Sequence, residues 1–97
     1  MILDTEKMEL SIFKTDGIYT IVTFVKLKPV EFRFIAGLLS NELVLYNRLS
    51  DIVFKKEVKK PKGYLSTLRT RLMKKIGINI EVRTNYGYIL KDTIYVI

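Results

Sequence analysis

The stretch that decides the fold is PKGYLSTLRTRLMKKIG, residues 61–77. At about 100° per residue, its apolar side chains fall within one narrow arc, which predicts an amphipathic helix over 61–76. The buried stripe of that helix consists of Leu65, Leu68, Leu72 and Ile76. Pro61 suits the first turn of a helix, and Gly77 is the residue type that most often follows the last one. The opposite face carries small, hydroxylated and basic residues: Gly63, Ser66, Thr67, Thr70, Arg71 and Lys74.

Two shorter helices are predicted upstream of this stretch. Pro29 and Glu31 favour a helix start, and apolar residues at helical spacing continue it to Ser40. A second helix is predicted over 45–54, where Leu49, Ile52 and Val53 would be buried. The segment that follows, residues 55–62, is a basic loop that leads into the third helix.

The remaining segments have the features of strands: two-residue alternation in 8–14 and 78–82, and a high content of β-branched and aromatic residues in 18–27. Residues 8–14 and 18–27 flank a turn at 15–17, and residues 1–4 can add a short third strand, which predicts an antiparallel sheet. After Gly77, residues 78–82 and 88–90 flank turn residues and predict a β-hairpin. The apolar tail 93–97 either pairs within this sheet or adds to the sheet edge of a neighbouring protomer. We therefore expect one α+β domain over 1–97.

The positive charge of the chain is confined to its second half. Residues 1–50 hold six basic and six acidic side chains, whereas residues 51–97 hold eleven basic against four acidic, so the whole net charge of +7 lies there. A lopsided basic surface attracts polyanions. Charge alone does not separate DNA from RNA or from an anionic membrane, and a lysine-rich face can also serve solubility.

The composition argues against an enzyme. The chain has no histidine and no cysteine, so the commonest general base, the commonest metal ligand and the disulfide are all missing. The carboxylates are scattered singly. We therefore expect no catalytic residue, no metal site and no cofactor. No apolar run approaches the ~18 residues of a membrane span, and no signal peptide is visible, so a cytoplasmic location without membrane contact is expected.

Several motifs together resemble a known family. In chain order they are LKPVEF (27–32), LL (38–39), LSDIVF (49–54), LSTLRTRL (65–72), and VR (82–83) with GYIL (87–90). This ordered set, over roughly residues 8–90, is similar to the DNA-binding effector domain of OmpR/PhoB-type response regulators. The resemblance implies a winged helix-turn-helix: an N-terminal antiparallel sheet, three helices and a C-terminal β-hairpin wing. It also implies that the helix over 60–76 enters the major groove while the wing over 82–88 lies on the adjacent minor groove.

The resemblance also implies roles for individual residues. Base-facing positions on the third helix are Gly63, Ser66 and Thr67. Phosphate-contacting positions are Tyr64 and Arg69, together with Lys59 or Lys60 from the preceding loop. Arg83 matches the wing arginine that reaches the minor groove. Tyr88 matches a wing tyrosine near the DNA backbone, although a core role is open to it as well.

Further cations of the same region are expected to neutralise phosphates, and they include Lys62, Arg71, Lys74 and Lys75. The chain departs from the family in two respects that bear on function. Ser66 and Thr67 stand where many relatives have arginines, and bidentate arginine-to-guanine contact is the strongest base-reading device. A different or weaker sequence preference is therefore expected. The chain also lacks a receiver domain, so it is either a stand-alone regulator or an excised domain.

These observations predict sequence-preferring binding of double-stranded DNA, in transcriptional regulation, with self-association on DNA as a further expectation. Plasmid or phage DNA segregation would need the same contacts. A different class of function also stays open, in which a winged helix docks onto a protein partner. An RNA-binding role is less favoured, because no interleaved platform of aromatic side chains is present.

Overall fold

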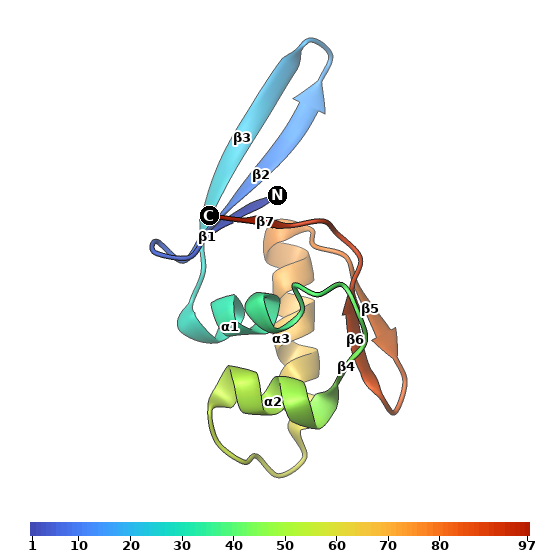
Figure 1. The fold of residues 1–97 in the computed structure, drawn as a ribbon. Helices are drawn as coiled ribbons and strands as arrows, with labels where there is room; N and C mark the ends of the chain where they lie inside the picture. The colour runs from blue at the N-terminus through green and yellow to red at the C-terminus, as the bar shows by residue number, and fades with distance from the viewer.

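Three helices and two sheets make up this α+β protein, which a computed structural model describes over residues 1–97 (Figure 1). The α+β class predicted from the sequence is confirmed. In chain order the elements are β1 (Ile2–Asp4), β2 (Glu9–Asp16), β3 (Tyr19–Lys26), α1 (Pro29–Gly37), β4 (Val44–Leu45), α2 (Tyr46–Phe54), α3 (Pro61–Ile76), β5 (Ile80–Arg83), β6 (Gly87–Leu90) and β7 (Tyr95–Val96).

Helix α3 has the bounds that its apolar period and its end signals predict. Gly77 follows it in the left-handed conformation with φ of 66°, and its N–H bonds to the carbonyl of Met73. The other two helices are shorter than predicted. Helix α1 ends at Gly37 instead of Ser40, because residues 38–40 form a turn that leads into Asn41, whose φ is 59°.

Helix α2 begins at Tyr46 because the two residues before it belong to a strand. Val44 and Leu45 form β4, which pairs with Tyr88 and Gly87 of β6. The predicted start at Leu45 is therefore wrong by one residue, and β4 was not predicted at all. A two-residue strand has no recognisable alternation, so only its partner across the sheet reveals it.

The first sheet has the strand order β3-β2-β1-β7, and the second has the order β4-β6-β5. The N-terminal antiparallel strands and the β5–β6 hairpin agree with the sequence prediction. The predicted turn at 15–17 is wrong: Thr15 and Asp16 pair with Thr20 and Tyr19, so the turn lies at Gly17 and Ile18. Strand β7 pairs in parallel with β1, with Tyr95 beside Ile2 and Val96 beside Leu3. The C-terminal tail thus lies in the sheet of its own chain, the first of the two arrangements considered for it.

A core of 18 buried apolar residues joins the three helices to both sheets. The predicted stripe of α3 is buried along its whole length, at Leu65, Leu68, Leu72 and Ile76. Tyr88 of β6 is the largest fully buried side chain, and its ring lies 5.8 Å from that of Phe34 and 5.3 Å from that of Tyr46. These edge and tilted contacts connect the β5–β6 hairpin to α1 and α2.

A buried ion pair fastens α1 to α3. Glu31 is fully buried, and its Oε1 accepts hydrogen bonds from the backbone N–H of Lys28 at 2.8 Å and from the Nζ of Lys75 at 2.9 Å. Burial by itself would raise the pKa of Glu31, but the Lys28 N–H and the Lys75 ammonium outweigh burial and hold this pKa below its ordinary value of 4.5. Glu31 is therefore charged at neutral pH, and the charge is part of the packing.

The variant Glu31→Gln should lower the free energy of unfolding by about 2 kcal/mol at pH 7, a modest loss for a charged hydrogen bond because a third of the Lys75 side chain is exposed. Because folding lowers this pKa, the ion pair stabilises the fold fully above about pH 4.5 and loses that effect as the pH falls below it. Urea denaturation of both proteins from pH 7 to pH 3 measures the difference. A gap that stays constant across this range would contradict the assigned ion pair.

Candidate nucleic-acid interface

The outward face of α3 is an open, polar surface. Five exposed side chains line a shallow depression along it, and none of them is apolar: Ser66, Thr67, Thr70, Arg71 and Lys74. The hydroxyl of Thr67 donates to the carbonyl of Gly63 at 3.1 Å, one turn earlier, which leaves its oxygen free to accept. The structure therefore brings together on one accessible face the α3 residues that the sequence placed there.

The N-terminal end of α3 presents a second group of predicted residues. Gly63 has open space around its Cα, so a neighbouring molecule can approach the backbone closely there. Tyr64 is 60% exposed and rests edge-on against the ring of Phe54 at 6.0 Å. Lys62 lies over the Tyr46 ring, with its Nζ 5.6 Å from the centroid.

Lys59 and Lys60 belong to the loop that precedes α3, and both are exposed. Lys60 has φ of 55°, a left-handed conformation that turns the chain into the helix at Pro61. The loop lysines thus lie beside the N-terminal turn of α3 and extend its positive surface.

One nitrogen of the Arg69 side chain is already used in a hydrogen bond within the molecule. Its Nε donates to the carbonyl of Ile80 at 2.8 Å, so the side chain links α3 to β5 and is only half-exposed. The expectation that Arg69 contacts phosphate thus rests on its two terminal nitrogens. This hydrogen bond ties the middle of α3 to the start of β5.

The hairpin arginine is also engaged. The Nε of Arg83 lies 2.9 Å from Oε2 of Glu81 on the same strand, and both side chains are largely exposed. The hydrogen bond from Arg83 lowers the pKa of Glu81, so this carboxylate is charged and offsets the arginine beside it. The hairpin is therefore less positively charged than the outward face of α3.

Tyr88 lies in the core and not on the surface. It is 2% exposed, and burial, together with the nearby Tyr46, raises the pKa of its phenol above 10.0. Of the two roles that the sequence left open, this position fits the core one. A spacing argument cannot separate them, because adjacent residues of a short hairpin face opposite sides and either register fits the pattern.

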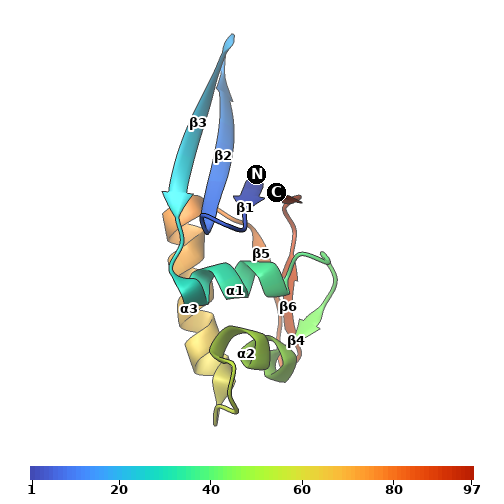
Figure 2. The ribbon, with the colours of Figure 1, turned by 60° about the vertical axis from the view of Figure 1, so that its left-hand side comes forward.

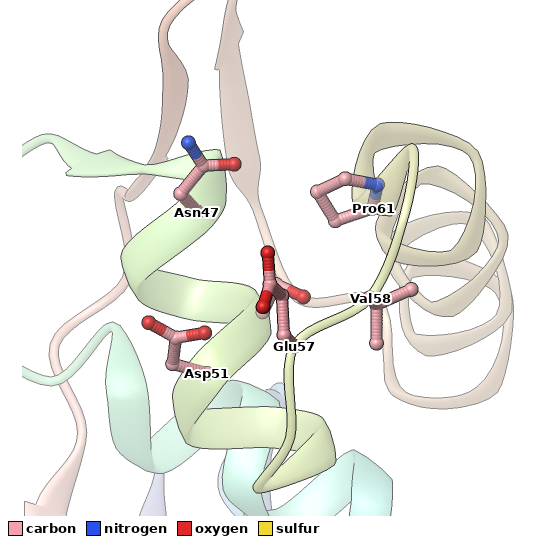
Figure 3. A pocket seen from close by; sticks show the side chains of 6 residues that line it. Asn47, Asp51, Glu57, Val58 and Pro61 are labelled. Atoms are coloured by element: carbon pink, nitrogen blue, oxygen red, sulfur yellow. The ribbon is translucent and has the colours of Figure 1, made fainter.

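The structure adds an acidic hollow that sequence reasoning did not single out. A depression of about 430 Å³ lies between α2 and the loop before α3, and it contains two carboxylates (Figure 3). Its lining residues are Asn47, Ser50, Asp51, Glu57, Val58 and Pro61. The signal in the sequence was the presence of Asp51 and Glu57 in an otherwise basic region. Because carboxylates repel phosphate, this hollow does not favour contact with a nucleic-acid backbone.

Comparison of the chain with protein-family models, with curated proteins and with solved structures finds no match. None of its helices combines the length and the apolar character that crossing a membrane requires.

Proposed function

We propose that this chain is a winged helix-turn-helix domain that binds double-stranded DNA, with α3 in the major groove and the β5–β6 hairpin as the wing on the adjacent minor groove. The observation that carries this proposal is the open polar face of α3, which no other part of the molecule covers. The proposal is also supported by the order of the elements, a sheet followed by three helices and a hairpin, which resembles the order implied by the likeness of the sequence motifs to OmpR/PhoB-type effector domains.

The chemistry of this face suits a duplex. Hydroxyl groups of Ser66 and Thr70 can donate to or accept from base edges, and small side chains let the helix lie deep in the groove. Arg71 and Lys74 carry positive charge near the C-terminal end of the same face, where they can neutralise phosphates. The exposed lysines of residues 55–62 do the same at the other end.

The same face sets a limit on specificity. It has no arginine near its N-terminal end, where base contacts are made, and Arg83 on the wing is paired with Glu81. Most of the binding free energy then comes from phosphates, and sequence preference comes from hydroxyl contacts and DNA shape. A transcriptional regulator with this chemistry would gain selectivity by binding as more than one copy. A protein that coats a plasmid or phage segregation site would use the same contacts.

The test is equilibrium binding of the full chain to a fluorescent duplex pool at increasing salt. With Arg71, Lys74 and the five lysines of residues 55–62 each neutralising one phosphate, log K should fall against log salt with a slope of about −6. Single-stranded DNA of the same composition is the control and should bind more weakly. Undetectable binding to duplex DNA at low salt, or binding without salt dependence, would refute the proposal.

One observation favours a second candidate, a protein-interaction module. Leu43, Tyr86 and Ile89 form an apolar hollow beside the hairpin, together with Arg83 and Thr84. Such a hollow suits an apolar side chain of a protein partner better than DNA. This candidate predicts that charge reversal at Lys60, Arg71 and Lys74 leaves partner binding intact, whereas it would abolish binding to DNA.

A further inference from the structure

The β2–β3 hairpin extends away from the helices, and both views show it projecting beyond the rest of the chain (Figures 1 and 2). Every residue from 13 to 24 is exposed. Six of them are large and apolar: Phe13, Ile18, Tyr19, Ile21, Val22 and Phe24. Ile18 at the turn is 91% exposed and Phe24 is 64% exposed. An apolar surface of this size on a small protein marks a contact with another molecule.

Strand β3 also has an unpaired edge. It is the outermost strand of its sheet, with β2 on one side only. The two-residue turn at Gly17 and Ile18 closes on the Asp16–Tyr19 pair, so the backbone groups of Tyr19, Ile21 and Thr23 face β2. Those of Thr20, Val22 and Phe24 face outwards.

This edge lacks the features that normally protect one. Residues 18–25 read IYTIVTFV, without a charge, a proline or a glycine. Natural proteins block exposed edges with lysines, prolines, bulges or very short strands, because an open edge pairs with other chains. We therefore expect this eight-residue uncharged edge to pair with a strand of another chain in the functional state of the protein.

We propose that β3 pairs with β3 of a second copy of this chain, antiparallel about a two-fold axis at Val22. In this register Val22 lies opposite the Val22 of the second copy, with both backbones in hydrogen-bonded positions. Thr20 then lies opposite Phe24, and Tyr19 lies opposite Val25. These are aromatic and β-branched cross-strand pairs, which stabilise antiparallel sheets, and no like charges meet.

The charge of the hairpin points to a protein copy and not to a polyanion. Residues 11–25 contain one lysine and one aspartate, although the whole chain carries +7. A phosphate backbone or an anionic bilayer has nothing to bind here. The exposed parts of the four apolar side chains on β3, which are Tyr19, Ile21, Val22 and Phe24, amount to roughly 400 Å². This is about half of the ~800 Å² that each partner contributes to a standard interface, and strand pairing adds main-chain hydrogen bonds along the edge.

The pairing does not depend on DNA binding, so the test uses the full chain without nucleic acid. Sedimentation equilibrium across micromolar concentrations should show a reversible dimer. Val22→Lys and Val22→Glu each place two like charges at the axis, and each should raise the dimer dissociation constant about 10-fold or more. An equimolar mixture of the two variants should restore the dimer, because the charges then face each other as opposites.

Thr15→Lys is the matched control. It adds the same charge to the same face of the hairpin, but on β2, which β3 separates from the edge. Its dimer should match that of the unmodified chain. Circular dichroism checks that all three variants fold, as expected for exposed positions outside the core.

Three results would overturn the proposal. The first is a monomer at every concentration, and the second is a dimer that Val22→Lys leaves unchanged. The third is a monomer that binds phosphatidylcholine vesicles through the hairpin, which would make the hairpin a lipid-binding element. Failure of the mixed variants to pair would contradict the register, since the charges are opposed only when the axis lies at Val22.

Discussion

Replacing Gly87 with alanine is expected to lower the free energy of unfolding by about 3 kcal/mol or more. A Cβ at this position would overlap the carbonyl oxygen of Val44 and lie 2.7 Å from its carbon. These are backbone atoms of β4, which pairs with β6, so no side-chain movement relieves the clash. The β4–β6 pairing would open, and Tyr88 would lose part of the packing that buries it.

Thermal denaturation should show the melting temperature of Gly87→Ala reduced by more than about 10 °C. The control is Gly63→Ala, because Gly63 lies inside α3 with open space where the Cβ would stand. That substitution should stabilise the protein by about 0.5–1 kcal/mol, since alanine loses less chain entropy in a helix. Equal melting temperatures for Gly87→Ala and the unmodified chain would show that β4 does not lie against β6.

Removing two cations from the outward face of α3 should have the second large effect. The double variant Arg71→Ala with Lys74→Ala is expected to bind duplex DNA about 10- to 100-fold more weakly at low salt, and to reduce the salt slope by about 2. Both side chains are exposed and make no ion pair within the molecule, so stability should change little.

The matched control removes two positive charges elsewhere. Lys7 and Lys28 are exposed, lie in the charge-balanced first half of the chain, and are not on the α3 face. The double variant Lys7→Ala with Lys28→Ala should retain most of the affinity and the salt slope. If the two double variants lose affinity equally, binding follows net charge alone, and α3 is not the contact surface.

The elements with a repeated signal were predictable from the sequence. Helix α3 repeats its apolar spacing over four turns and is bounded by Pro61 and Gly77, so its limits are those expected. The helix also sets the candidate site, since burying Leu65, Leu68 and Leu72 forces Thr67, Thr70 and Lys74 outwards. Strand β2 followed from its alternation, and β3 followed from its β-branched and aromatic residues and from the glycine that precedes it.

The short elements and the roles of single polar residues were not predictable in this way. Strand β4 has two residues and is defined by its partner β6. The sequence predicts Arg69 as an exposed cation, but its Nε donates a hydrogen bond to the carbonyl of Ile80, eleven residues away. The sequence predicts Arg83 as a free wing arginine, but it forms an ion pair with Glu81, which lies two residues earlier on the same face of the strand.

The sequence by itself determined the amphipathic face of α3, the order of sheet, helices and hairpin, and the placement of the positive charge in the second half. All three depend on the local spacing of apolar residues along the chain or on the count of charged residues in each half. Only the tertiary structure decided that Glu31 is buried against Lys75, that Tyr88 lies in the core, and that β7 pairs with β1. These depend on contacts between residues far apart in the chain, whose geometry is fixed when the helices and sheets pack.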